Sequence, residues 1–362
     1  MSSYPSRTDL INAMKNPQVS FNGTELIGGK VVTGKLGPLV YAGGYALVFP
    51  FINKDKKKVA VRCWFADIGN QKKKSQEIST YLDNLKSEYF ANFKYVEDAL
   101  LTNNSYQSIV IMDWIEGKTL KKYVNEVIND KVKILGLAER FKEMIAFFHK
   151  KNIAHGDLQH GNIMVKSDGH LVIIDYDSMY IETLKNMPDT IQGLPGYQHP
   201  ARKHNKFTNS KMDYFSELVV YLSLLIFADD PSLWPVYYET EDLLFSSEDF
   251  VSPNTSSLIK KMSNSNNKKI KDLTMKLREE LNKNDLSKLL PLDELLINKW
   301  DETINEFKIK IEKPISPSKK REIDYPDLKE TSSKFEQQPN PPKKKETTFP
   351  GLNETIKKFT KK

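Results

Sequence analysis

The sequence has almost no cysteine and no long apolar segment. Cys63 is the single cysteine among 362 residues, which excludes an internal disulfide bond and a zinc site made of several cysteines. The longest apolar run, 218–228, has eleven residues, whereas a membrane-spanning helix needs about 20. The first ten residues, MSSYPSRTDL, lack the apolar stretch of a secretory signal peptide. These absences predict a soluble, cytoplasmic protein without a membrane partner.

The sequence also has little excess charge of either sign outside its C-terminal tail. The whole chain carries a net charge of +7, but residues 313–362 contain 13 Lys/Arg and 7 Asp/Glu and therefore supply +6 of it. The first 312 residues are left with a net charge of +1. A folded domain that binds nucleic acid is expected to carry a basic face. The composition therefore argues against a nucleic-acid partner.

Residues 299–362 are predicted to form a basic tail rich in proline and lysine. Seven prolines and few apolar residues fall between 313 and 362, and such a composition buries too little surface to offset chain entropy. We therefore expect disorder there. The tail is also the predicted place of autophosphorylation and partner binding, through Ser316, Ser318, Thr331, Ser332, Ser333, Thr347 and Thr348. A tail that only solubilises the chain is the alternative.

Hydrophobic periodicity divides the rest of the chain into a strand-rich and a helix-rich part. Near the N-terminus, Thr8 is the predicted N-cap of a short helix. Strands are predicted at 38–41, 45–49, 59–64, 108–115, 163–165 and 171–174, and helices at 71–85, 135–151, around 219–227 and within 256–298. The order predicts a small sheet-rich lobe followed by a larger helical lobe.

The densest group of chemically useful residues is the stretch HGDLQHGN, 155–162, followed by IIDYD, 173–177. It places two carboxylates and a carboxamide on loops that flank a short predicted hairpin. Phosphoryl transfer from a nucleotide needs a carboxylate to orient the attacking hydroxyl and oxygen ligands for Mg²⁺. Asp157 suits the first task, and Asn162 with Asp175 suits the second.

These motifs resemble the catalytic loop H-R-D-L-x-x-x-N and the D-F-G of the protein-kinase superfamily. Asp157 precedes Asn162 by five residues and Asp175 by eighteen, which are the family's intervals. The sequence of the loop, HGDLQHGN, is most similar to that of a bacterial branch of serine/threonine kinase-like proteins. It also resembles the H-G-D-L-x-P-G-N loop of aminoglycoside and choline phosphotransferases.

The resemblance implies an α+β, two-lobed kinase fold with an antiparallel N-lobe sheet and a helical C-lobe. We place an N-terminal extension at 1–35, the N-lobe at 36–115, the C-lobe at 116–298 and the tail at 299–362. The family binds ATP between its lobes, with Mg²⁺, and we expect both cofactors here.

The resemblance assigns five residues to the part of the ATP site outside the adenine contacts. Gly43, Gly44 and Tyr45 stand where the family has its glycine-rich loop, although only Gly43 falls on a family glycine. Arg62 takes the place of the lysine that reaches the α- and β-phosphates, and it keeps the positive charge. Glu77, at the start of an apolar helical stripe, is the candidate glutamate that pairs with Arg62.

The adenine site follows from the same resemblance. The implied residues are Val48, Ala60, Met112 as gatekeeper, the backbone of Asp113 and Ile115, and Met164 as the floor. Core packing explains Met112, Asp113, Ile115 and Met164 equally well.

The catalytic loop departs from the family pattern at two positions. Gly156 replaces the arginine that reads a phosphate on the activation segment, so control through Ser178, Thr183 or Thr190 is not expected. Gln159 replaces a lysine that contacts the γ-phosphate, and we assign it to catalysis with Asp157. Asp213 matches the aspartate that binds the catalytic-loop backbone.

The sequence therefore predicts an ATP- and Mg²⁺-dependent serine/threonine protein kinase, whose partners are ATP and an unidentified protein substrate. A small-molecule phosphotransferase of the aminoglycoside or choline type is one alternative. An ATP-binding pseudokinase that acts as a scaffold is the other, suggested by the altered glycine loop, Arg62 and Gln159.

Overall fold

The computed structural model describes residues 4–66, 70–103 and 105–297. The tail predicted at 299–362 lies outside the described residues, and so do the disorder and the phosphorylation sites expected there.

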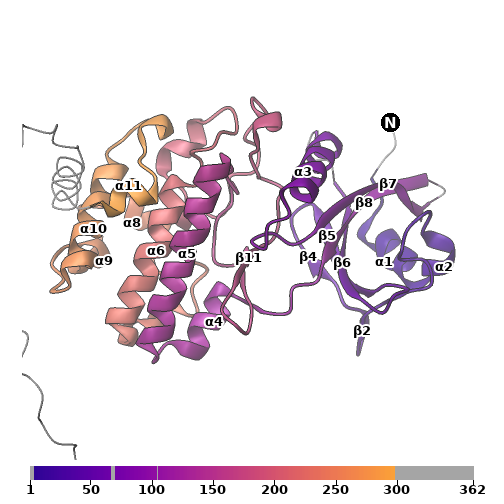
Figure 1. The fold of residues 1–362 in the computed structure, drawn as a ribbon, viewed down its shortest axis with the longest axis horizontal. Coiled ribbons are helices and arrows are strands. Elements are labelled where there is room, and N and C mark those ends of the chain that lie inside the picture. The colour runs from indigo at the N-terminus through magenta and orange to yellow at the C-terminus, as the bar shows by residue number, and fades with distance from the viewer. Residues whose placement is uncertain (1–3, 67–69, 104, 298–362) are drawn as a thin grey trace, which may run out of the picture. The chain divides into compact units, whose positions relative to one another are not determined.

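The first third of the chain forms a curled antiparallel sheet (Figure 1). Its strands are β1 (Lys30–Val31), β4 (Tyr41–Ala42), β5 (Ala46–Ile52), β6 (Lys58–Trp64), β7 (Phe93–Thr102) and β8 (Ser105–Asp113). They are ordered β1-β5-β6-β8-β7, with β4 paired to β5. A separate hairpin joins β2 (Thr33–Gly34) to β3 (Gly37–Pro38). Strand β6 is buried on both faces, which explains why its apolar residues do not alternate with exposed polar ones, and Arg62 is the charged residue within its buried stretch.

The N-terminal extension is packed against this sheet. Helices α1 (Arg7–Lys15) and α2 (Pro17–Ser20) lie on the sheet face away from the helical region (Figure 1). Leu10 and Met14 are fully buried there, in one cluster with Phe49 and Val61. The predicted cap at Thr8 is wrong, because Ser6 caps α1 in a reciprocal box with Asp9. The residue that caps the helix is therefore two positions before the predicted one.

Truncating the buried face of α1 is expected to destabilise the sheet. Leu10→Ala should lower the free energy of unfolding by about 2–5 kcal/mol, because it removes a fully buried side chain and leaves a cavity. Asn12→Ala, on the exposed face of the same helix, is the matched control and should change it by less than about 0.5 kcal/mol. Urea denaturation measures both. Equal effects of the two substitutions would show that the extension is not part of the core.

The helical region begins after β8. Its helices are α4 (Leu120–Val127), α5 (Lys131–Lys151), α6 (Tyr214–Asp229), α7 (Trp234–Tyr237), α8 (Ser247–Val251), α9 (Ser257–Ser263), α10 (Lys268–Leu281) and α11 (Leu292–Leu296). A small sheet of β9 (Lys118–Thr119), β10 (Ile163–Val165) and β11 (Leu171–Ile173) lies beside it. Helix α3 (Gln71–Leu85) packs on β7 and matches the predicted helix. The prediction of an α+β fold with two lobes is confirmed, although β7 and α4 were not predicted.

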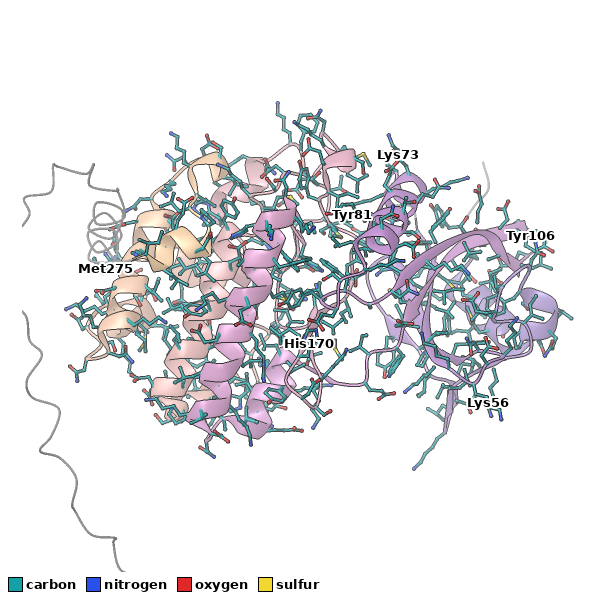
Figure 2. All side chains as sticks on the ribbon, in the orientation of Figure 1. Lys56, Lys73, Tyr81, Tyr106, His170 and Met275 are labelled. Atoms are coloured by element: carbon teal, nitrogen blue, oxygen red, sulfur yellow. The ribbon has the colours of Figure 1, made fainter. Side chains whose placement is uncertain are left out.

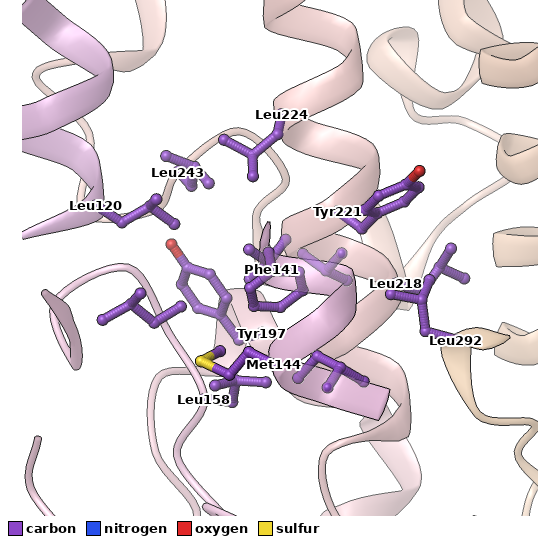
Figure 3. Packing of buried hydrophobic residues seen from close by; sticks show 14 of the residues in the cluster. Leu120, Phe141, Met144, Leu158, Tyr197, Leu218, Tyr221, Leu224, Leu243 and Leu292 are labelled. Carbon is purple, nitrogen blue, oxygen red and sulfur yellow. The ribbon is translucent and has the colours of Figure 1, made fainter. Parts of the chain in front are cut away.

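Helices α5 and α6 pack against each other in the middle of the helical region (Figure 1). Phe141 of α5 and Leu218 of α6 are fully buried there, together with Leu158, the neighbour of Asp157 in the catalytic loop (Figure 3). Among the described residues no single helix is long and apolar enough to cross a membrane. The bent pair formed by α6 and residues 231–237 has the length and composition of a membrane span and no other feature of one. Helix α6 is buried within the protein from Phe215 to Ala228.

Candidate active site

The loop that carries Asp157 is held from below by Asp213, the residue that precedes α6. Asp213 accepts hydrogen bonds from the backbone N–H groups of His155 and of Gly156, the latter at 2.8 Å. The imidazole of His155, itself buried, lies 3.0 Å from the carbonyl oxygen of Ile174. The prediction that Asp213 binds the catalytic-loop backbone is confirmed. Loop and β11 are therefore joined through one buried histidine.

Asp157 lies half-buried between the loop and a second segment of chain. Its Oδ2 accepts a hydrogen bond from Nδ2 of Asn162 at 2.9 Å, and its Oδ1 lies 3.4 Å from the N–H of Leu194. Gly193 has a positive φ of 72°, and a Cβ there would lie 2.1 Å from Oδ1 of Asp157. Burial raises the pKa of Asp157, and the negative charge of Asp175 acts in the same direction. The arrangement favours a carboxylate that accepts a proton readily.

Asn162 and Asp175, the predicted oxygen donors, both act on this carboxylate, Asn162 through a hydrogen bond and Asp175 through its charge. The side-chain nitrogen Nδ2 of Asn162 donates to the backbone carbonyl oxygen and to Oδ2 of Asp157, each at 2.9 Å. The amide oxygen of Asn162 is therefore turned away from Asp157. Asp175 adopts a left-handed φ of 66°, which aspartate tolerates, and its side chain is 44% exposed. Burial alone would raise the pKa of Asp175, but the charge and hydrogen bond of Arg62 outweigh it, so the pKa is lowered.

An ionised carboxylate and an amide oxygen are donors that suit a hard cation such as Mg²⁺. Within the described ranges no cluster of three or more His, Cys, Asp or Glu side chains forms a metal site. A cation held by Asn162 and Asp175 therefore needs further oxygens from water or phosphate, as Mg²⁺ at nucleotide sites does.

Tyr176 anchors the segment that carries Asp175. It is fully buried, and its hydroxyl donates to the carbonyl oxygens of Ile173 at 2.8 Å and Ala91 at 3.2 Å. Its ring packs edge-on against Phe90 and Phe93. Because the aromatic side chain points into the core, the preceding Asp175 is turned outward.

Arg62 of β6 reaches this segment. Its Nη1 lies 2.7 Å from Oδ1 of Asp175, and its Nη2 forms an ion pair with Asp177. The predicted pair with Glu77 is wrong. The buried face of α3 is formed by Gln71, Lys74, Ser75, Ile78 and Leu82, and Glu77 lies beside that face. The helical period placed Glu77 next to the apolar stripe. The side chains of α3 that act on this site are Gln71 and Lys74, through a hydrogen bond and a charge on Asp177.

Three of the residues predicted to contact adenine, Val48, Ala60 and Met112, share one side of the N-terminal sheet. Ala60 and Met112 are paired neighbours on β6 and β8 and belong to the core cluster that continues into the helical region. Val48 of β5 pairs with Arg62, and Met164 lies in β10. These four and the half-buried Ile115 are placed compatibly with an adenine site.

Two further predictions concern the edges of that site. The N–H of Asp113 donates to the carbonyl oxygen of Asn92 at 3.1 Å, which leaves only its carbonyl for a ligand. Gly43 and Gly44 form the exposed turn between β4 and β5, followed by an exposed Tyr45. A Cβ on Gly44 would meet nothing within 4 Å, so the fold itself does not demand glycine there. Close approach of a ligand to the backbone remains a reason for these glycines.

Gln159 turns back onto its own loop. Its side-chain oxygen accepts a hydrogen bond from the N–H of Gly161 at 2.6 Å. This contact shapes the turn before Asn162, and its assignment to catalysis stays a prediction.

Arg202 is a functional residue that the sequence reasoning missed. Its guanidinium is buried and binds Asp189 in a bidentate way, with distances of 3.1 and 3.0 Å. Its Nη1 also donates to the carbonyl oxygen of Gly156 at 2.5 Å. Its position directly after Pro200-Ala201 is the feature of the sequence that could have predicted this role. The ion pair closes segment 189–202 on itself, and the hydrogen bond from Arg202 to Gly156 joins this segment to the catalytic loop.

The contacts around Gly156 explain why the arginine that binds an activation-segment phosphate in the family is absent here. A Cβ on Gly156 would lie 2.3 Å from the carbonyl oxygen of Ser178, and the φ of Gly156 is 80°. Ser178 is itself buried, and its hydroxyl donates to the carbonyl oxygen of Ile191 at 2.9 Å. Thr183 and Thr190 are exposed. No side chain fits at position 156, so the departure from the family arginine has a steric cause.

A comparison with known families agrees with this geometry. The profile of the protein kinase domain matches residues 34–300. The chain belongs to the protein kinase family. The match covers both the sheet and the helical region, and it begins where α1 and α2 have ended.

Individual kinases are similar to this chain at low identity. The serine/threonine-protein kinase PrkC of Bacillus subtilis is 22% identical over 204 residues, which are 54% of this chain and 31% of PrkC. The serine/threonine-protein kinase ULK3 of Xenopus laevis is 22% identical over 60% of this chain and 46% of its own. A probable serine/threonine-protein kinase of Clostridium acetobutylicum is 36% identical over 30% of this chain and 17% of its own. The chain spans less than half the length of each of these relatives.

Proposed function

We propose that this kinase-family chain transfers the γ-phosphoryl group of ATP, with Mg²⁺, to a serine or threonine hydroxyl of a protein. The observation that supports this most is the assembly of Asp157, Asn162, Asp175 and Arg62 at one place. They come from three separate stretches of sequence. Asp157 lies 2.9 Å from Asn162, and Arg62 lies 2.7 Å from Asp175.

In this proposal Asp157 receives the proton of the acceptor hydroxyl. The hydroxyl oxygen forms the new bond to the γ-phosphorus, and the bond from phosphorus to the leaving ADP oxygen breaks. Asn162 fixes Asp157 through the 2.9 Å hydrogen bond, so the carboxylate meets the hydroxyl in one orientation. Asp175 and the amide oxygen of Asn162 would hold Mg²⁺, which neutralises phosphate charge when bound. Arg62 adds a fixed positive charge beside Asp175.

The choice of a protein acceptor rests on the names of the relatives and on segment 193–201. Leu194 contacts Asp157 through its N–H, and the buried Tyr197 binds His160 of the catalytic loop through its hydroxyl. The pKa of His160 is lowered to about 4, first by burial and then by the charge of Lys121, so its ring is neutral at pH 7. An ordered backbone beside the catalytic carboxylate is a suitable surface for an extended peptide.

Purified full-length chain incubated with γ-labelled ATP and Mg²⁺ tests the proposal. Label should pass to a generic protein acceptor or to the chain's own serine and threonine residues. Label passed only to an aminoglycoside or to choline would favour the small-molecule alternative. Binding of ATP without transfer to any acceptor would favour the pseudokinase.

Removing the carboxylate of Asp175 is expected to weaken Mg²⁺-dependent ATP binding. Asp175→Ala should raise the dissociation constant of Mg·ATP by about tenfold or more, since loss of an ionic contact is worth at least ~1.4 kcal/mol. Affinity measured in EDTA should change much less. Asp168→Ala, an exposed carboxylate on the turn between β10 and β11, is the matched control. Calorimetry with and without Mg²⁺ gives both numbers, and an equal change in the two conditions would remove Asp175 from the metal site.

A further inference from the structure

Asp177 bridges the sheet and helix α3. One of its carboxylate oxygens pairs with Nη2 of Arg62 on β6. The other accepts a hydrogen bond from Nε2 of Gln71, the first residue of α3, at 3.3 Å. The side chain of Asp177 is 13% exposed, so these contacts replace most of its water.

The buried face of α3 carries a cation where the sequence analysis expected an anion. Lys74 is buried on this face, whereas its neighbour Lys73 is exposed on the outer side (Figure 2). Burial lowers the pKa of Lys74 to about 8, and the charges of Asp177 and Asp189 oppose this shift. Within the described part of the helix, Gln71 and Lys74 are thus the polar groups that face Asp177. The negative charge for Arg62 comes from the segment after β11 instead.

Arg62 needs a second acceptor if Asp175 is to remain available to a cation. A guanidinium group presents a planar fork of donors, which one acceptor does not orient fully. Asp175 engages only Nη1, at 2.7 Å. Without Asp177, the whole charge of Arg62 would fall on Asp175 and would compete there with a bound cation.

We infer that Asp177 is the positioning residue that holds Arg62 toward the phosphates of the nucleotide and ties β6 to α3, the role expected of Glu77. The inference rests on the proposed ATP binding at the same site. Asp177 acts through Arg62 and contacts neither acceptor nor phosphate itself.

A double-mutant cycle on the full-length chain tests this. Asp177→Asn should weaken Mg·ATP binding by about tenfold, the size expected when a charge-assisted contact is lost. In an Arg62→Met background the same substitution should change affinity by less than about twofold, because its effect passes through Arg62. Asp168→Asn is the matched control and should leave affinity unchanged. Thermal unfolding of each variant shows that it is folded.

Hydrogen exchange in the nucleotide-free protein separates this inference from the proposed function. Asp177→Asn should speed exchange in the first turns of α3, where Gln71 loses its charged partner, and Asp168→Asn should not. Wild-type affinity in Asp177→Asn, or an equal loss in both backgrounds, would overturn the inference. Failure of the wild type to bind Mg·ATP would overturn the proposed function, and exchange in α3 would then decide whether Asp177 ties the helix.

Discussion

Replacing Asp157 by asparagine is expected to lower phosphoryl transfer by about 10²- to 10⁴-fold, the usual contribution of a positioned general base. The substitution removes the charge that attracts the hydroxyl proton but keeps one oxygen that can accept the hydrogen bond of Asn162. Arg62 and Asp175 do not contact Asp157 through any hydrogen bond or ion pair that the structure shows among the described residues. Nucleotide binding should therefore stay within about twofold of wild type.

Single-turnover transfer from labelled ATP and calorimetric binding of Mg·ATP measure the two quantities separately. Asp168→Asn, which changes an exposed carboxylate on the turn between β10 and β11, is the control and should keep full transfer. Wild-type turnover in Asp157→Asn would assign the catalytic carboxylate elsewhere. Equal losses in transfer and in binding would make Asp157 a residue of the nucleotide site instead.

Replacing Arg202 by methionine is expected to lower the free energy of unfolding by about 3–5 kcal/mol, because it leaves the buried carboxylate of Asp189 without its partner. The Arg202 and Asp189 side chains are each only 1% exposed, so water cannot take over the lost contacts. The carbonyl oxygen of Gly156 loses a donor in the same substitution. Segment 189–202 and the catalytic loop should then separate, and transfer should fall with stability.

Urea denaturation of Arg202→Met, with Lys203→Met as the exposed neighbour for control, measures this effect. The double variant Arg202→Met/Asp189→Leu should lose less than the sum of the two single variants, since an unpaired buried charge is then absent. A double variant whose loss of stability equals the sum of the two single losses would argue against an ion pair.

Thr183→Ala and Thr190→Ala should leave activity unchanged, because the segment is held by Arg202 rather than by a phosphate.

Local spacing was sufficient to predict which carboxylates of the candidate site come together. The intervals between Asp157, Asn162 and Asp175 are properties of one loop and one hairpin, so the geometry follows once β10 and β11 pair. The same holds for helix α3, whose bounds the apolar period gave correctly. Structure of this kind depends on residues that are close together in the sequence, so it can be predicted from the sequence alone.

Partners across the fold were less predictable. Arg62 and Asp177 are separated by 115 positions, and Arg202 meets Gly156 across 46. A period of 3.6 tells which residues share a helix face but not which of them faces a given strand, so Glu77 was chosen over the face that carries Gln71 and Lys74. Composition had also given no sign that α1 would cover the sheet.

By itself the sequence determined the kinase fold, the catalytic loop and the residues that supply oxygen donors, because motif spacing and hydrophobic period depend only on neighbours along the chain. Tertiary structure alone decided how charge is balanced around Arg62 and Arg202. Buried charges need partners at hydrogen-bond distance, and in this chain those partners, Asp177 and Asp189, are supplied by segments whose position depends on the whole packed core.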